Sequence, residues 1–115
     1  MVELRYADDL RKSVDIDYWG ARHQGDGDLN ATPAGFATAG GATLAIVRQG
    51  RGDWATCGAE RDDWVSEVPY SALTPGGYLC ARSSEGRTAY LRIESLPTET
   101  YPAINFYGFT WDDPN

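Results

Sequence analysis

The residues best suited to bind a ligand form the stretch "GDGDLN", in which oxygen-bearing side chains occupy alternate positions. Asp26, Asp28 and Asn30 match the first, third and fifth positions of a calcium-binding loop. The sixth and twelfth positions of that loop are then Ala31 and Ala37, which supply neither the sharp glycine turn nor a bidentate carboxylate. Glycine, aspartate and asparagine also form ordinary turns. We therefore expect an acidic turn without a cofactor, and calcium bound by the three side chains is the alternative.

A second calcium-loop frame begins at Asp15 in "DIDYWGARHQGD". Asp15 and Asp17 take its first and third positions. Trp19 stands at the fifth position, where an oxygen ligand is needed, and Asp26 at the twelfth is one methylene shorter than glutamate. No helix is expected on either side of the two frames, so neither frame is an EF-hand.

Catalytic residue patterns are weak in this chain. His23 is the only histidine, it lies in a polar loop rich in glycine, and no serine occupies a G-x-S-x-G turn. Neighbouring carboxylates such as Asp62 and Asp63 have the chemistry of an acid and base pair, but a glycosidase cleft generally needs a longer chain. We therefore expect no catalytic residues and a protein that is not an enzyme.

Tryptophans are candidates for partner binding: Trp54, Trp64 and Trp111 neighbour charged residues in "GDWAT", "RDDWVSE" and "TWDDPN", and Trp19 lies on the polar face of its predicted strand. An aromatic ring beside a carboxylate suits a sugar or a peptide, because the ring stacks and the oxygens accept hydrogen bonds. Tryptophan in a small sandwich is more often a core residue, and we expect this of at least two of the four. Trp19 is the one predicted to be exposed. The predicted binding residues are Trp19, Asp26, Asp28, Asn30, Trp54 and Trp64.

Length and charge exclude several classes of protein. The chain of 115 residues accommodates one domain, predicted over 1–115, with one modest core. A net charge of −7 with ten scattered basic residues makes nucleic acid and anionic membranes poor partners. No window approaches the roughly 18 apolar residues of a membrane span, so we expect no membrane insertion. Residues 1–13 do not resemble a signal peptide, so we expect either a cytosolic protein or a fragment of an exported one.

The placement of glycine and proline predicts an all-β protein. Thirteen glycines and six prolines interrupt the apolar segments, and no segment keeps a helical stripe beyond two turns. The segment "ATLAIVRQG" is a continuous apolar run that suits a central strand. The segment "SVDIDYW" alternates, which predicts an antiparallel strand. Its expected buried residues are Val14, Ile16 and Tyr18, and its expected exposed residues are Asp15, Asp17 and Trp19.

The clearest predicted element is a hairpin in "GYLCARSSEGRTAYLRIESL", where Gly86 supplies the positive φ that a short loop needs. On its second arm Ala89, Leu91 and Ile93 face the core. The segment "AINFYGFTW" predicts a last strand, with Gly108 marking a bulge. Short helical turns fit only "DDLRKS" and "RDDWVSEVPYSAL", and Pro69 is expected to end the second.

This succession of short strands favours a small antiparallel β-sandwich, and a small β-barrel is the alternative. Residues 25–41 are small and polar, and they form the one predicted loop long enough to be functional. Cys57 and Cys80 are too few for a structural zinc site and do not form a C-x-x-C pair. A disulfide is expected in an oxidising compartment, and two buried free thiols are the alternative in the cytosol.

The stretch "VPYSALTPGGYLCARSSEGRTAYLRI" resembles a C-terminal β-module appended to membrane or secreted proteins of high-GC Gram-positive bacteria, including some receptor-type serine/threonine kinases. In that family a leucine and a glycine precede an "LC-x-R-[TS]-S-E-G-R" hairpin, and a late strand ends near a tryptophan. The counterparts here are Leu73, Gly76, Leu79 to Arg87, Trp111, the upstream Cys57, and Asp15, Ile16 and Asp17 for an earlier "D-[IL]-D" strand. The family's "D-x-D-T-G" is "DIDYWG" here, and the loop from Gly20 to Gly41 has no counterpart.

The resemblance implies a β-rich, disulfide-bearing, non-catalytic module that acts outside the cytoplasm, and it supplies no ligand. We therefore expect a binding or sensory module that recognises a protein or glycan partner in an extracytoplasmic or secreted setting. The alternative is a small acidic inhibitor or immunity-type protein that blocks a basic protein partner, because its charge would steer the encounter.

Overall fold

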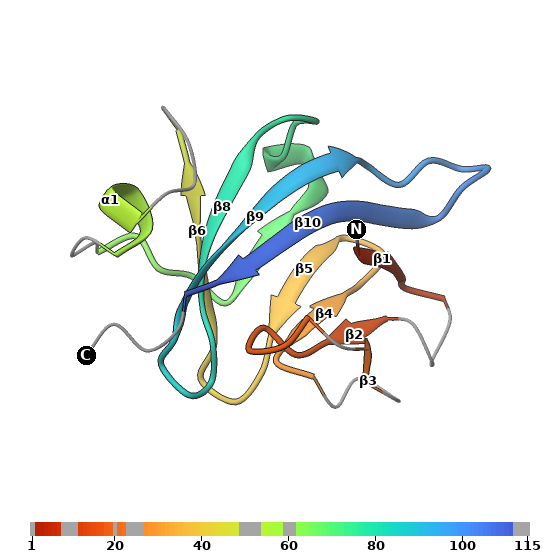
Figure 1. Cartoon of the computed structure of the whole chain (residues 1–115). Helices are drawn as coiled ribbons and strands as arrows, with labels where there is room; N and C mark the ends of the chain where they lie inside the picture. The colour runs from red at the N-terminus through yellow and green to blue at the C-terminus, as the bar shows by residue number, and fades with distance from the viewer. Residues whose placement is uncertain are drawn as a thin grey trace.

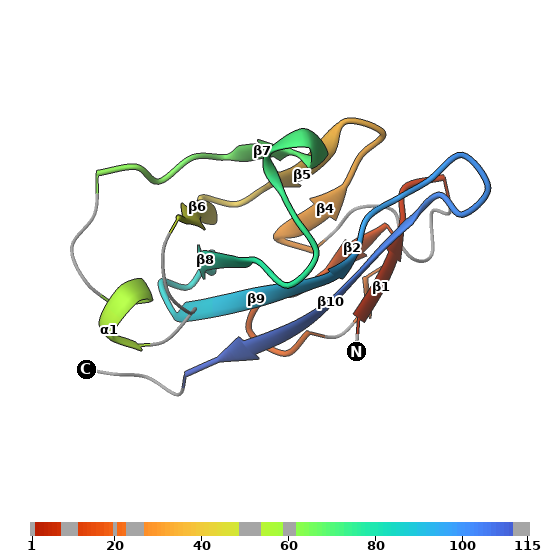
Figure 2. The same ribbon diagram turned by 90° about the horizontal axis from the view of Figure 1, so that it is seen from above.

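The computed structural model describes residues 2–7, 12–19, 21–22, 27–48, 54–58 and 62–111, which form two antiparallel sheets (Figure 1). In spatial order the first sheet contains β1 (Val2–Arg5), β10 (Ala103–Thr110), β9 (Thr88–Ser95), β8 (Tyr78–Arg82) and β6 (Thr43–Val47). The second contains β3 (Ala21–Arg22), β2 (Ser13–Val14), β4 (Leu29–Ala31), β5 (Gly35–Thr38) and β7 (Glu67–Pro69). Figure 2 shows β8, β9 and β10 in one layer and β4, β5 and β7 in the other. The two sheets stay open, so the predicted sandwich is confirmed over the barrel.

The apolar core lies between the two sheets because each strand turns its alternate apolar side chains inward. Phe106 from β10 and Phe36 from β5 meet there edge to face, with ring centroids 5.5 Å apart. The predicted inward side of the hairpin arm is confirmed, since Ala89, Leu91 and Ile93 of β9 are all buried. The hairpin turn also follows the prediction, because Gly86 has a φ of 85°.

The segment from Ser13 to Trp19 differs from its prediction after the second residue. Only Ser13 and Val14 pair as a strand, and the chain then turns, with the N–H of Trp19 donating to the carbonyl of Asp15 at 2.6 Å. The alternation of buried and exposed side chains that is typical of a strand therefore stops after Val14. Ile16 is buried as expected, but Tyr18 is 67% exposed and Asp17 is buried, which reverses both expectations.

Trp19 is half-buried against the core, so its predicted exposure is wrong. Its ring packs on the backbone of β10 at Gly108, where an added Cβ would lie 2.4 Å from Cδ2 of the indole. Gly108 therefore makes room for Trp19. The expected bulge occurs elsewhere in the strand, between Asn105 and Phe106.

Residues 25–41 were expected to be a loop, but the described part of this stretch forms the β4–β5 hairpin. Leu29, Ala31 and Phe36 are buried in the core. The turn between the strands is held by Thr32, whose N–H and hydroxyl both donate to the carbonyl of Gly35, at 2.8 and 2.9 Å. The loop prediction was wrong because a composition rich in glycine and alanine fits two structures. It is typical of loops, and it also fits strands that pack closely between two sheets, as these do.

Strand β6 was expected to be central, yet it lies at the edge of the first sheet. Leu44 pairs with Val65 through two backbone hydrogen bonds of 2.7 and 2.8 Å, in an isolated bridge outside the sheet. One residue later the carbonyl of Ser66 accepts a hydrogen bond from Thr38 in the second sheet. The chain at Val65 and Ser66 therefore links the two sheets along one side.

The helical elements are short. A 3-10 turn, η2 (Tyr70–Ala72), begins after Pro69 in the second predicted segment, so Pro69 precedes this turn and does not end one. Helix α1 (Trp54–Cys57) was not predicted. Residues 8–11 of the other predicted turn lie outside the described part of the chain.

Cys57 at the end of α1 is bonded to Cys80 in β8, so the disulfide expectation is confirmed over free thiols. Both cysteines are fully buried and form a small second core with Ala45 on the outer side of the first sheet. The disulfide therefore holds α1 against the outer side of that sheet.

Candidate functional site

The structure describes some of the predicted binding residues and not others. Asp26 and His23 lie outside the described residues, and of Trp54 only the backbone position at the start of α1 is described. Trp64 packs beside the disulfide core, and the guanidinium of Arg82 lies 4.7 Å from the centroid of its ring. Trp64 is thus part of a packed cluster on the outer side of the first sheet.

The other predicted binding residues have separate positions. Trp19 packs against β10 from the core side of the sandwich. Asn30 is half-buried, and its Nδ2 donates to the carbonyl of Gly27 at 3.2 Å. Asp28 is buried and lies among acidic residues of another segment. Among the described residues, Trp19 therefore packs against the core between the sheets, whereas Trp64 packs beside the disulfide.

A surface that the sequence analysis did not identify lies on the outer side of β8, β9 and β10. We call it the aromatic face, and it consists of Tyr78, Tyr90, Arg92, Tyr107, Phe109 and Trp111. Tyr107 and Phe109 are 43% and 46% exposed. A shallow hollow of about 290 Å³ lies over the face. Large exposed aromatic side chains grouped in this way mark a binding surface more often than an inert one.

The rings of the aromatic face contact one another. Tyr90 is central, with ring centroids 5.8 Å from Tyr78, 5.7 Å from Phe109 and 5.6 Å from Trp111. Phe109 also meets Trp111 edge to face at 5.3 Å. Rings packed in this way lose little side-chain freedom when a partner binds, so the surface is preorganised.

One cation lies among the rings. The guanidinium of Arg92 lies 4.8 Å from the ring centroid of Tyr107, within the range of a cation–π contact. Its Nη2 donates to Glu94 Oε1 at 2.9 Å. The hydrogen bond and charge of Glu94 raise the pKa of Arg92, so its positive charge is retained at every physiological pH.

The sequence does contain the signal for this surface. In "TAYLRIE" and "NFYGFTW" the large residues opposite the core positions are Tyr90, Arg92, Tyr107, Phe109 and Trp111. When two strands with mostly aromatic residues at their outward positions pair with each other, those residues form an apolar outer face. The register supplies that pairing, since Tyr90 lies opposite Phe109 and Arg92 lies opposite Tyr107.

Three carboxylates meet at a second place, between the turn after β2 and the tip of the β8–β9 hairpin. Asp15, Asp17 and Asp28 each have a carboxylate oxygen within 4.8 Å of the other two. Two come from the frame that begins at Asp15 and one from the frame that begins at Asp26, so neither frame alone identified the cluster. We call these three residues the acidic cluster.

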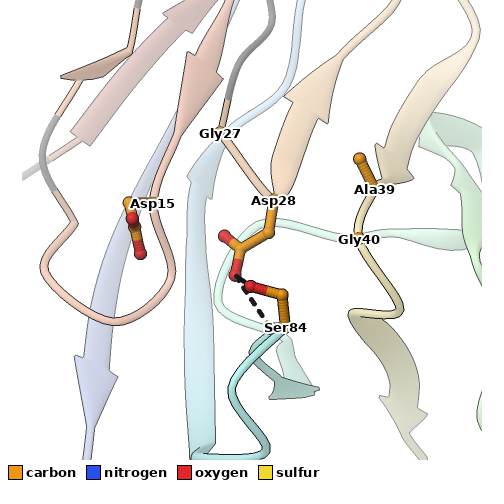
Figure 3. A pocket seen from close by; sticks show the side chains of 6 residues that line it. All are labelled: Asp15, Gly27, Asp28, Ala39, Gly40 and Ser84. Atoms are coloured by element: carbon orange, nitrogen blue, oxygen red, sulfur yellow. Dashed lines mark hydrogen bonds between the residues drawn. The ribbon is translucent and has the colours of Figure 1, made fainter.

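Asp28 connects three segments of the chain. Its Oδ1 accepts a hydrogen bond from the N–H of Ile16 at 2.6 Å, and its Oδ2 accepts from the N–H and the hydroxyl of Ser84 at 3.0 and 3.3 Å. Figure 3 shows the bonds to Ser84 and places Asp15 on the facing segment. A hollow of about 130 Å³ lies beside them, lined also by Gly27, Ala39 and Gly40.

Asp17 is a buried member of the acidic cluster, with a side chain only 1% exposed. Neither of its carboxylate oxygens has a hydrogen-bond partner among the described residues. The guanidinium of Arg87 lies 3.8 Å away, beyond hydrogen-bond distance. Burial raises the pKa of Asp17, the neighbouring Ser83 hydroxyl lowers it in part, and the nearby charges of Glu85 and Asp15 raise it further.

Comparisons with known proteins returned nothing: no protein-family model, no curated protein and no solved structure matches this chain. Within the described residues, no helix has the length and apolar character needed to cross a bilayer. Function must therefore be argued from the two sites themselves.

Proposed function

We propose that the chain is a non-catalytic binding module that recognises a protein partner outside the cytoplasm through the aromatic face. The observation that supports this proposal is the set of aromatic rings on the outer side of β8–β10, with Tyr107 and Phe109 nearly half exposed. Tyrosine, tryptophan and arginine are the residue types that contribute most to protein interfaces, and all three occur here.

The ring geometry favours a protein partner over a glycan. A sugar stacks on an exposed ring face, but the face of Tyr107 carries Arg92, and Tyr90 stacks on Phe109. The rings of Tyr107 and Phe109 stay 43% and 46% exposed, and Tyr107 also carries a hydroxyl. That surface suits a protein segment that offers apolar side chains to the rings and carbonyl oxygens to the hydroxyls.

The disulfide and the sequence resemblance support an extracytoplasmic location. Cys57 and Cys80 are bonded and buried, and disulfides of this kind persist in oxidising compartments. The hairpin "LCARSSEGR" resembles a module of membrane or secreted proteins, and in the structure it supplies Cys80 and connects Tyr78 to the β9 strand that carries Tyr90.

The alternative of an acidic inhibitor is less well supported. Such a protein would present its carboxylates to a basic partner. The aromatic face instead carries the positive charge of Arg92. The net charge of −7 and exposed carboxylates such as Asp62, Asp63 and Glu67 favour this alternative.

The test compares retention of extracellular proteins and of purified cell-wall glycan, both from the source organism, on the immobilised protein. A Tyr107→Ala/Phe109→Ala variant should lose retention of a protein by at least about tenfold, because interface aromatics often contribute 2 kcal/mol or more. Its melting temperature should change little, since both side chains are half exposed.

The matched control is Tyr101→Ala, which removes another partly exposed ring outside the aromatic face, where it contacts Glu3 and Arg5. This variant should bind like the wild type. Retention on isolated glycan, lost in the double variant, would replace the protein partner by a sugar. Equal binding by all three proteins would remove the aromatic face from the proposal.

A further inference from the structure

We propose that the acidic cluster of Asp15, Asp17 and Asp28 binds one calcium ion between the turn after β2 and the tip of the β8–β9 hairpin. This site is separate from the aromatic face and does not depend on the proposed binding function. It also differs from the calcium alternative of the sequence, because it uses two carboxylates of the segment from Asp15 in place of Asp26 and Asn30.

The first support is the buried carboxylate of Asp17. Its side chain is 1% exposed, and neither oxygen accepts a hydrogen bond from a described residue. A buried carboxylate is costly unless it is paired, hydrogen-bonded or bound to a metal. One of its oxygens lies within 4.8 Å of oxygens of both Asp15 and Asp28, so it is directed toward the other members of the cluster.

The second support is the balance of charge around Asp17. Asp15 and Asp28 each have a carboxylate oxygen within 4.8 Å of one of its own. Arg87 is the cation that contacts it, at 3.8 Å, and contributes one positive charge without a hydrogen bond. Three carboxylates gathered around one buried position repel one another, and a divalent cation would reverse the sign of that interaction.

The spacing suits calcium. Calcium binds oxygen at about 2.3–2.6 Å, so oxygens of one shell lie up to about 4.6–5.2 Å apart, and three oxygens within 4.8 Å of one another can share one ion. Magnesium has a tighter octahedral shell, at about 2.0–2.1 Å, and usually keeps several waters. The hollow of about 130 Å³ beside Asp15 and Asp28 gives room for water ligands, and the hydroxyl of Ser84 lies on its wall.

A bound ion would join segments that are far apart in the chain. Asp28 already connects to Ile16 and Ser84, which are 12 and 56 residues away. Calcium would add Asp15 and Asp17 to this connection. It should therefore stabilise the folded chain, because the unfolded chain does not hold the three carboxylates together.

The experiment measures the melting temperature of the full chain with calcium chloride, with magnesium chloride and with a chelator, in buffered potassium chloride. For the wild type we expect a rise that grows with calcium concentration, about 10 °C when calcium exceeds its Kd 100-fold. Asp17→Asn has the same shape and removes the buried charge, so it should keep its fold and lose the calcium response. Asp62→Asn, an exposed aspartate elsewhere, is the matched control and should respond like the wild type.

Calorimetric titration of the wild type with calcium alone gives a second readout that needs no variant. Saturable binding of about one ion per chain is expected. Absence of saturable binding up to 10 mM calcium would overturn the proposal, whatever the behaviour of Asp17→Asn. An equal response to magnesium would also overturn it, because the site would then not select calcium. An unchanged calcium response in Asp17→Asn would overturn it as well, because it would indicate general screening of the acidic chain.

Discussion

Gly108 of β10 lies against the ring of Trp19, and this contact gives a sharp prediction. A Cβ at position 108 would lie 2.4–2.7 Å from three atoms of the Trp19 ring. We expect Gly108→Ala to reduce the free energy of unfolding by about 1–3 kcal/mol, as overpacked cores do. Urea unfolding measures the change.

A double-mutant cycle with Trp19→Ala provides the control for this prediction. In that background the ring is absent, so Gly108→Ala should cost much less than in the wild type. Additive effects of the two substitutions would show that the glycine matters for another reason, such as the pairing of β10 with β9.

At the same scale, the sequence contained all three residues of the acidic cluster but divided them between two calcium-loop frames. Asp28 was a candidate ligand with Asp26 and Asn30, and Asp15 and Asp17 belonged to the other frame. In the structure Asp28 lies beside Asp15 and Asp17, and Asp26 lies outside the described residues. The spacing of residues along the sequence predicts a set of metal ligands only when a single loop supplies all of them. Contacts between segments 12 or 56 residues apart depend on the packing of the sheets.

At the level of elements, the disulfide attaches α1 to β8 and closes a loop between residues 57 and 80. We expect Cys57→Ala/Cys80→Ala to reduce the free energy of unfolding by about 3 kcal/mol, because the open loop gains conformational freedom in the unfolded chain. Thermal unfolding should show a melting temperature lower by about 10 °C.

Reductant supplies the control for the disulfide prediction. The wild type unfolded and refolded in reductant should approach the stability of the double variant, whereas the variant itself should not respond. A wild type with equal stability in both conditions would mean that the small outer core, and not the covalent bond, holds α1 in place.

Elements with strong local signals were predicted well, and elements defined by packing were not. The β8–β9 hairpin has alternating arms and a glycine at its turn, and both features are local. The β4–β5 hairpin consists mostly of small residues, so its local hydrophobic pattern is weak. Its two strands are stabilised by the burial of Leu29 and Phe36 against the opposite sheet, which is a tertiary contact. The position of β6 at the edge was likewise missed, because strand order depends on pairing and not on the hydrophobicity of the strand itself.

At the scale of the whole molecule, the two candidate functions predict different effects of salt on binding affinity. One function depends on the net charge of −7 and the other on the aromatic face. Binding through packed rings should change by less than about threefold between 0.05 and 0.5 M sodium chloride, because apolar contacts are not screened. An acidic inhibitor that binds a basic partner should weaken by more than about tenfold over the same range. Affinity measured across this series distinguishes the two functions.

The pairing of β1 with β10 also determines how the fold responds to mechanical load. In their antiparallel register Val2 lies opposite Phe106 and Arg5 lies opposite Ala103, so the outer ends of both strands leave the ladder on the same side (Figure 1). Tension between Val2 and Thr110 would therefore unzip the two strands one hydrogen bond at a time. The disulfide joins Cys57 to Cys80, so the chain between them does not bear the tension and cannot be extended by it. This closed loop contains β7 and η2.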